Sequence, residues 1–145
     1  MTEFKNNIAV VNLYEPQDQA GTDTVSNILD TAQFNGAAIA VQVGALTGVD
    51  GSNYLVPTMQ ESDTLIGTDF SDVNAADLIG SFTKIDATSE DSVVQYCGYQ
   101  GNKRYLRVNC NYTGSGITAG IVGVIGILGL AGNKPVTPPA ALAAV

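Results

Sequence analysis

The segment GIVGVIGILGLAG, residues 120–132, has a glycine at every third position and only apolar residues between the glycines. A membrane-spanning helix needs about 20 apolar residues and loses about 1 kcal/mol at each interior glycine, whereas this run covers roughly 16 residues when it is counted from Ile117. Collagen requires many more triplets and abundant proline, and the intervening isoleucine, valine and leucine favour strands. The segment therefore predicts a fully buried β-strand, with glycines on both faces where neighbours approach, in preference to an irregular glycine-rich element.

Length and composition favour one all-β domain. The 145 residues are 45% hydrophobic and 14% charged, with 16 glycines and 6 tyrosines. Such a chain can bury one core, and its composition favours strands and turns. We expect a β-sandwich or jelly-roll-like single domain with extended terminal arms. The predicted boundaries are 1–135 for the domain, within which 1–25 is partly an extended arm, and 136–145 for an extended C-terminal tail.

Other segments show strand or turn patterns. Residues 8–13, IAVVNL, form a short β-rich run that ends in a loop, and residues 34–48, FNGAAIAVQVGALTG, read as a strand. One face of that second strand is predicted to carry Ala37, Ile39, Val41 and Val43. Small residues on its other face predict burial on both sides. The helical candidate, SDVNAADLIG, predicts a single turn capped by Asp72 or Asn74 and ended by Gly80.

The segment SVVQYCGYQGNKRYLRVNCNYTG, residues 92–114, predicts a β-hairpin that turns around Gly101 and Asn102. The core face of its second strand would carry Leu106, Val108, Cys110 and Tyr112. The alternate face would be polar. In either register of this hairpin, Cys97 and Cys110 would lie too far apart or on opposite faces, so we expect two buried, unbridged thiols.

The chain is acidic, with six basic and fourteen acidic residues and a net charge of −8 at pH 7. Such a field repels nucleic acid and anionic lipid, so we expect neither as a partner. Half of the basic residues, Lys103, Arg104 and Arg107, lie beside Tyr105. This pattern can bind phosphate, but we expect the three charges to pair with carboxylates of the chain or with an acidic partner. The N-terminal sequence lacks the pattern of a secretory signal, which favours synthesis in a cytoplasm.

Side chains suited to catalysis are scarce. The chain has no histidine, which removes the commonest general base and most zinc sites. No spacing marks two carboxylates as a facing pair, and no GKS or GKT follows the glycines as in a phosphate-binding loop. Calcium ligands could come from Glu61, Asp63, Asp69, Asp72 and Asp77, but these lack the spacing of a calcium loop, so solvated turns are expected. We expect no enzyme activity, no cofactor and no metal.

The order of segments resembles that of small β-rich head-module proteins of tailed bacteriophages. The resemblance runs from ILDTAQFNGAAIAVQVGALT through TMQESD and DLIGSF to QYCGYQGNKRYLRVNCNYTGSGITAGIVGVIGILG and GNKP, over residues 28–135. It is most specific at Gly98, Tyr99, Gly101 and residues 103–108. The chain departs from the pattern at Thr64, where an acidic residue is usual, and in the many glycines of the last strand.

The resemblance implies a capsid decoration, or cement, protein, made in the host cytoplasm and located on the capsid exterior of the virion. Such a protein would bind the major capsid protein as a homotrimer and stabilise the head. We expect the terminal arms to supply partner contacts, at Tyr14, Pro16, Val136, Pro138 and Pro139. Two alternatives stay open: a carbohydrate- or host-surface-binding β-sandwich module that uses its loops, and a head-to-tail connector or tail component.

Overall fold

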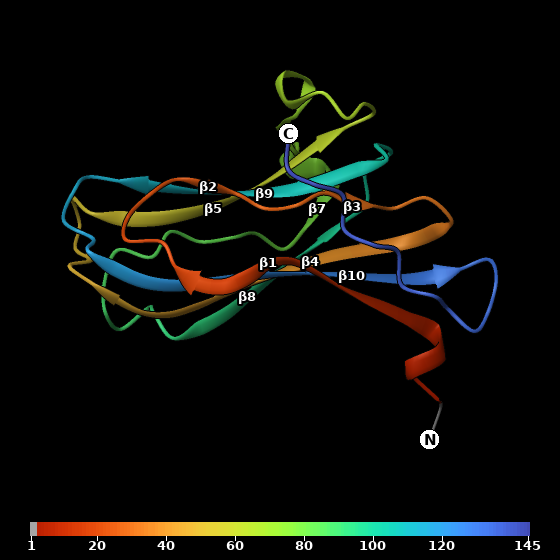
Figure 1. Ribbon diagram of the computed structural model, residues 1–145, viewed down its shortest axis with the longest axis horizontal. Coiled ribbons are helices and arrows are strands. Elements are labelled where there is room, and N and C mark those ends of the chain that lie inside the picture. The colour runs from red at the N-terminus through yellow and green to blue at the C-terminus, as the bar shows by residue number, and fades with distance from the viewer. Residues whose placement is uncertain (1–2) are drawn as a thin grey trace.

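Two antiparallel sheets packed face to face make up the computed structural model, which describes residues 3–145 (Figure 1). The strands are β1 (Ile8–Asp18), β2 (Thr24–Val25), β3 (Leu29–Asp30), β4 (Phe34–Thr47), β5 (Tyr54–Ser62), β6 (Ser71–Asp72), β7 (Leu78–Ile79), β8 (Val93–Tyr99), β9 (Tyr105–Thr113) and β10 (Ala119–Ala131). Three short 3₁₀ helices are η1 (Lys5–Asn7), η2 (Gly67–Asp69) and η3 (Ala75–Asp77). The predicted all-β sandwich is confirmed.

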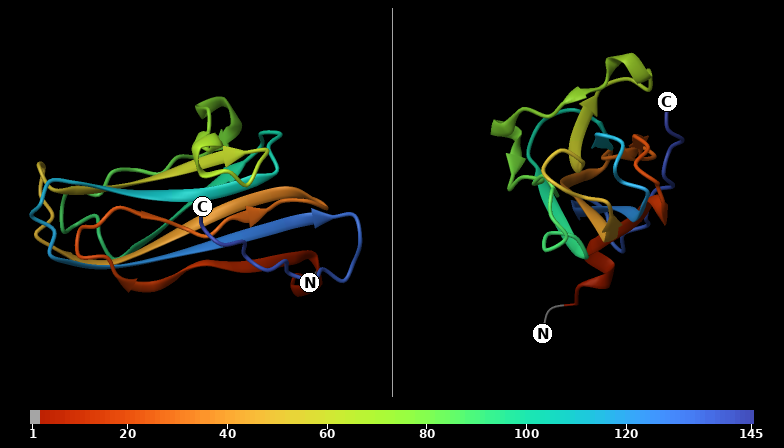
Figure 2. Two further views of the ribbon diagram at one scale, coloured as in Figure 1. Left: turned by 45° about the horizontal axis from the view of Figure 1, so that its top comes forward. Right: turned by 90° about the vertical axis from the view of Figure 1, so that its left-hand side faces the viewer.

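The first sheet, sheet A, has the strand order β1-β10-β4-β8-β7, and the second, sheet B, has the order β2-β9-β5-β6 with β3 also paired to β9. Figure 2 shows the two layers from further sides. Their inner faces meet in one core, to which sheet A contributes Ile39, Val41, Val43, Val122, Val124 and Leu128, and sheet B contributes Leu55, Met59, Leu106, Val108 and Cys110. The face predicted for residues 34–48 and the alternation predicted for residues 105–112 are both confirmed.

The glycine-rich strand β10 lies inside sheet A, between β1 and β4. Gly120 packs against the side chain of Leu46, and a β-carbon built on Gly126 would lie 2.8 Å from Leu29 Cδ1. On the opposite face, a β-carbon on Gly123 would lie 3.0 Å from Pro16 Cγ. The prediction of close neighbours on both faces is confirmed at these three glycines. The prediction of full burial is wrong, because Ile121 on the outer face is 53% exposed.

The N-terminal segment belongs to the sheet. Strand β1 pairs with β10 over its whole length, with irregularities between Asn12 and Tyr14 and between Tyr14 and Gln17. Pro16 fits this strand because β1 is at the edge of sheet A, where a missing N–H leaves no partner unsatisfied. The arm predicted within residues 1–25 is therefore a strand over Ile8–Asp18, and residues 1–2 lie outside the described part.

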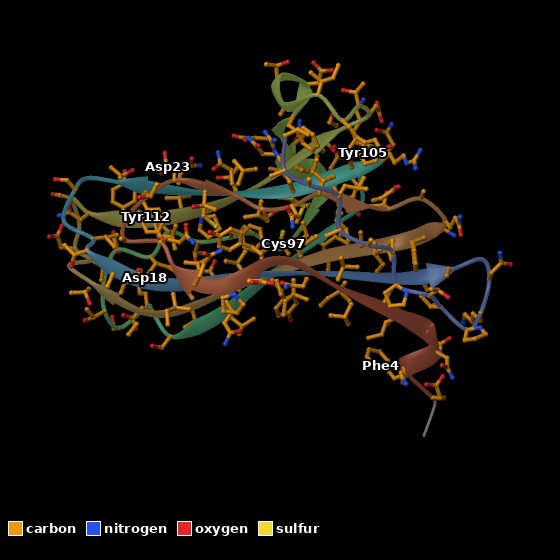
Figure 3. The ribbon with its side chains drawn as sticks, viewed as in Figure 1. Phe4, Asp18, Asp23, Cys97, Tyr105 and Tyr112 are labelled. Atoms are coloured by element: carbon orange, nitrogen blue, oxygen red, sulfur yellow. The ribbon has the colours of Figure 1, made fainter. Side chains whose placement is uncertain are left out.

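The predicted hairpin of residues 92–114 is wrong. Strand β8 belongs to sheet A and β9 to sheet B, so the segment between them crosses from one sheet to the other. The Tyr99 hydroxyl accepts a hydrogen bond from the Lys103 backbone N–H, at 2.8 Å, and donates to the Glu61 carboxylate. These contacts hold the crossing segment against β5 of sheet B. Cys97 and Cys110 are buried and unbridged on different sheets, and Figure 3 shows Cys97 in the middle of the molecule.

The predicted helical turn is present as η3. The Asn74 side chain accepts a hydrogen bond from the Ala76 N–H, at 2.9 Å, which makes Asn74 the cap. Asp72, the alternative cap, lies in β6. The turn ends at Asp77, and Gly80 follows after the two residues of β7.

The C-terminal tail lies against the domain. Figure 1 shows it turning back from the end of β10 and running across the edge of the sandwich. Two backbone hydrogen bonds, of 2.7 and 3.0 Å, join Leu142 to Ile28. The Leu142 side chain also packs on a buried cluster of Ile28, Phe70 and Tyr105. The tail predicted over 136–145 is thus packed on the chain itself, where the Leu142 side chain is half-buried.

Candidate interaction surfaces

The outer face of sheet A, which points away from the core, is mostly apolar. Its outward-pointing residues include Val10 and Asn12 of β1 and Ile121, Gly123, Ile125 and Ile127 of β10. They also include Gly36, Ala38, Ala40, Gln42 and Gly44 of β4 and Val94 and Tyr96 of β8. None of these residues is charged, although the chain carries twenty charged side chains in all. A carboxylate borders them at the end of β1, where Asp18 pairs with Ile121 and accepts hydrogen bonds from the Ala20 and Gly120 N–H groups. We call this set of residues the outer face.

Rows of apolar residues cross the outer face from strand to strand. Ile125 lies between Asn12 and Ala40, and Ala40 lies beside Tyr96. Tyr96 is 73% exposed, Val94 60% and Val10 52%. An antiparallel sheet with one face in water normally places polar residues on that face. A contiguous apolar face of this kind is typical of an interaction surface.

A hollow of about 300 Å³ opens on the outer face where β1 departs from regular pairing. The irregular pairing places Pro16 over Gly123, and Ile125 and Gln42 line the hollow beside them. Tyr14 also lines it, and its hydroxyl accepts a hydrogen bond from the Gln19 amide. Two of the five residues predicted to contact a partner, Tyr14 and Pro16, thus border the outer face.

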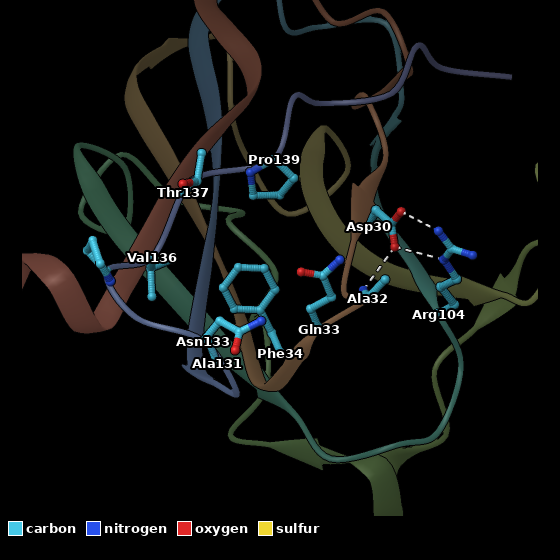
Figure 4. Close-up of a pocket in the computed structure, with 11 residues that line it drawn as sticks. Asp30, Ala32, Gln33, Phe34, Arg104, Ala131, Asn133, Val136, Thr137 and Pro139 are labelled. Atoms are coloured by element: carbon cyan, nitrogen blue, oxygen red, sulfur yellow. Dashed lines mark hydrogen bonds and ion pairs between the residues drawn. The ribbon is translucent and has the colours of Figure 1, made fainter.

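A second pocket, of about 290 Å³, lies where the tail passes the start of β4 (Figure 4). Val136 and Pro139 line it together with Phe34. Pro138 is exposed and does not line this pocket. The five predicted contact residues are therefore not brought to one place.

The same pocket contains an ion pair between Arg104 and Asp30. The Arg104 guanidinium donates from Nε and Nη2 to the two carboxylate oxygens, at 2.9 and 2.8 Å. The Asp30 carboxylate also accepts from the Ala32 N–H, at 2.9 Å. The hydrogen bonds from Arg104 hold the pKa of Asp30 below its ordinary value.

The basic cluster is engaged within the chain. Lys103 pairs with Asp63 and Arg104 with Asp30, which confirms the expected pairing with carboxylates at these two positions. Arg107 differs, because it is buried and donates to the Gln60 side chain at 2.9 Å, and its guanidinium lies 4.1 Å from the centre of the Phe70 ring. It also donates to the backbone carbonyls of Val145 and Gly67, at 2.9 and 3.3 Å. Burial lowers the pKa of Arg107.

Four of the five acidic residues considered as calcium ligands have separate partners, which for Glu61 is the Tyr99 hydroxyl and for Asp63 is Lys103. Asp69 accepts from the Thr64 hydroxyl at 2.6 Å, and Asp72 accepts from the Gln60 amide at 2.9 Å. Over residues 3–145, no three side chains of the metal-binding types gather as a site. Within the same residues, no helix is long and apolar enough to cross a membrane.

Sequence reasoning missed the outer face as a surface, although two signals pointed to it. The first was the series of small residues that alternates with the core side chains of β4, and the second was the apolar character of β10 at both odd and even positions. Both signals predict cover on the second face of the sheet. Neither tells which molecule provides that cover.

No protein-family model matches the chain, and no curated protein sequence matches it. Among solved structures, it is similar to the SPBc2 prophage-derived protein YomS, with 12% identity and a TM-score of 0.44 over 88% of this chain and 97% of that one. It is also similar to part of dimeric latent PorU from Porphyromonas gingivalis, with 12% identity and a TM-score of 0.44 over 88% of this chain and 13% of that one. A third similarity is to a Clostridium thermocellum xylanase 10B structure with CBM22-1 and GH10 modules, with 10% identity and a TM-score of 0.38 over 94% of this chain and 28% of that one.

Proposed function

We propose that this chain is a phage virion structural protein, a decoration protein that binds the outer capsid surface as a homotrimer and stabilises the head. The observation that carries this proposal is the outer face. Its apolar side chains include Ile121 and Tyr96, 53% and 73% exposed. In a chain of net charge −8, none of the residues that define this face is charged. Depletion of charge with exposed apolar and aromatic residues is typical of the core of a protein interface.

The other chemistry-bearing side chains serve the fold, which supports a structural role. Lys103 and Arg104 pair with carboxylates, and the Arg107 guanidinium is held by Gln60. The Cys110 thiol is buried, and burial raises its pKa to about 12. The resemblance of residues 98–108 to phage head proteins covers the end of β8, the segment that crosses between the two sheets and the start of β9.

A closed trimer would present three copies of each capsid contact at once. The second and third contacts then form at high effective concentration, so modest individual contacts add up to stable binding. Bridging neighbouring capsid subunits in this way adds buried interface that opposes the outward pressure of packaged DNA. Pro138, exposed on the tail, is available for such a contact.

The test uses capsids that lack the protein, prepared in the expanded form. Purified protein is added over a range of concentrations, bound protein is measured by co-sedimentation, and its solution mass is measured by light scattering. We expect saturable binding, a mass near three times 15.0 kDa, and a higher temperature of DNA release from decorated heads. Pro138→Glu is expected to weaken capsid binding without changing the solution mass. Failure to bind capsids, together with saturable glycan binding by a monomer, would overturn the proposal in favour of a carbohydrate-binding module.

A further inference from the structure

The side chains of the outer face project from the sheet to different extents on two adjacent strands. Strand β10 bears the isoleucine ridge, Ile121, Ile125 and Ile127. The adjacent strand β4 bears the small-residue trough, Gly36, Ala38, Ala40 and Gly44. Ile125 and Ile127 lie beside Ala40 and Ala38 in the register of the two strands. On the far side of the trough, Tyr96 of β8 lies beside Ala40. A ridge and a trough therefore run side by side, one strand apart.

The ridge and the trough are each interrupted at one position, and the two positions lie side by side on β10 and β4. Gly123 leaves a gap in the ridge, and Gln42, directly beside it on β4, is the long side chain within the trough. The gap opens into the hollow beside Pro16, of about 300 Å³. Two copies related by a rotation axis parallel to the strands would bring together residues that lie at the same level along the strands. Gln42 of one copy would then meet the hollow of its neighbour.

Charge favours a second copy as the occupant of this face. Each chain has a net charge of −8, yet the residues that define the outer face are uncharged. Two copies can therefore meet over these residues with the Asp18 carboxylates kept at the border of the face. A strongly basic or acidic partner would find no opposite charge among these residues, so it would gain no attraction from them.

The size of the face fits three copies around one axis. Four strands spaced about 4.8 Å apart are about 19 Å wide, and three such faces enclose a triangular space whose centre lies about 5.5 Å from each sheet. This distance is close to half of the roughly 10 Å that separates packed sheets, so one layer of side chains fills the space. With strands about 24 Å long, the three faces together cover about 1,400 Å², which is about 460 Å² for each of the three contacts between copies.

We infer that the outer face of sheet A is the self-association surface of the protein, where the isoleucine ridge of one copy packs into the small-residue trough of the next. The inference rests on the homotrimer of the proposed function and identifies the surface that forms it. Each copy gives a ridge to one neighbour and receives a ridge from the other, which closes after three copies.

The first test places a charge on the ridge. Ile125→Glu introduces a carboxylate at a solvent-exposed site, so the protomer is expected to fold. Its matched control is Leu65→Glu, which makes a similar change at a 43% exposed position outside the outer face. Light scattering over a dilution series is expected to give the wild-type mass for Leu65→Glu and a threefold lower mass for Ile125→Glu. Circular dichroism checks that both variants are folded.

The second test asks whether ridge and trough meet between different copies. Ala40→Lys places a positive charge in the trough and is expected to be monomeric by itself. Mixing it with Ile125→Glu is expected to raise the mass above that of either variant alone, because the ridge carboxylate of one copy then meets the trough ammonium of the next. A ring of three built from two variants keeps one unmatched contact, so the association is expected to stay weaker than in the wild type. This rescue does not occur if Ile125 and Ala40 belong to separate contacts.

The outcomes separate this inference from the proposed function. A trimeric Ile125→Glu variant, or a wild-type protein that is monomeric over the dilution series, overturns the inference about the outer face. A trimer that depends on Ile125 but does not bind capsids supports the inference and overturns the decoration function.

Discussion

Gly126 of β10 lies directly against Leu29 of β3 in the core. A β-carbon on Gly126 would lie 2.8 Å from Leu29 Cδ1 and 3.2 Å from Leu13 Cδ1. Leu29 and Leu13 are both buried, so neither side chain can move into solvent. The missing side chain at position 126 lets sheet B approach the middle of sheet A.

Gly126→Ala is expected to lower the free energy of unfolding by about 1–3 kcal/mol, the usual cost of overpacking a filled core. The matched control is Gly129→Ala in the same strand, where the nearest atom to an added β-carbon is the Asn7 carbonyl oxygen at 4.0 Å. Urea denaturation at one protein concentration measures both. Equal effects of the two substitutions would contradict the contact with Leu29.

Asp30 is expected to contribute to acid sensitivity. Hydrogen bonds from Arg104 lower the pKa of Asp30 in the folded state, so the unfolded chain binds its proton more readily. The resulting stability is present above the unfolded pKa of about 3.9 and is lost as the pH falls through the folded pKa. Asp30→Asn is expected to lower the free energy of unfolding at pH 7 by about 1 kcal/mol and to flatten its decline below pH 5.

Urea denaturation between pH 3 and pH 7 measures that slope. Arg104→Gln is the companion variant, because it removes the largest cause of the low pKa and leaves the carboxyl group and its hydrogen bond from the Ala32 N–H in place. Both variants are expected to reduce the slope. An unchanged slope in Asp30→Asn would contradict a role for this ion pair.

The two thiols are expected to be unreactive in the folded protein. Burial raises the pKa of Cys110 to about 12 and also raises that of Cys97, and alkylation requires the thiolate. Iodoacetamide at pH 8 is expected to label both cysteines in urea and neither within the same time in buffer. The single variants Cys97→Ala and Cys110→Ala show whether any labelling occurs at Cys110 in β9 or at Cys97 in β8. Fast labelling in buffer would contradict the prediction and show that the labelled strand opens locally.

Leu142 is expected to hold the tail in place. Leu142→Ala removes a half-buried side chain from the cluster with Ile28, Phe70 and Tyr105, so a cost of about 1–2 kcal/mol is expected. Pro138→Ala is the control, because Pro138 is exposed. The Ile28 amide, which donates to the Leu142 carbonyl at 2.7 Å, is expected to exchange faster with solvent in Leu142→Ala. Unchanged exchange of this amide would contradict the role of Leu142.

Local patterns predicted the faces of the strands but not their partners. The alternation from Leu106 to Tyr112 identified the core side of β9, because a strand turns successive side chains to opposite faces. The same alternation is compatible with pairing to β8 or with crossing to the other sheet. What separates the two strands is the pairing of β8 with β4 and of β9 with β5. The Tyr99 hydroxyl joins the two sheets through its contacts with Lys103 and Glu61. Glu61 is distant in the sequence, so no local pattern shows that contact.

The outer face shows the same difference between what local patterns predict and what they do not. Small residues on one face of residues 34–48 predicted cover for that face, and the structure shows the face open in one protomer. Tyr14 and Pro16 were expected in an extended arm, yet they border the outer face because β1 continues through Pro16 at the sheet edge. Val136 and Pro139 were expected to be free for a partner, and they line a pocket of the chain's own domain.

The pairing of β1 with β10 joins the first strand of the chain to the last. On a ribosome that adds about 5–20 residues per second, the roughly 100 residues between these strands take about 5–20 s to be made. During that interval the apolar residues 8–13 have emerged but have no β10 to pair with. Sheet A can therefore close only after β10 has emerged, and until then residues 8–13 are where a chaperone that binds apolar extended chains would act first.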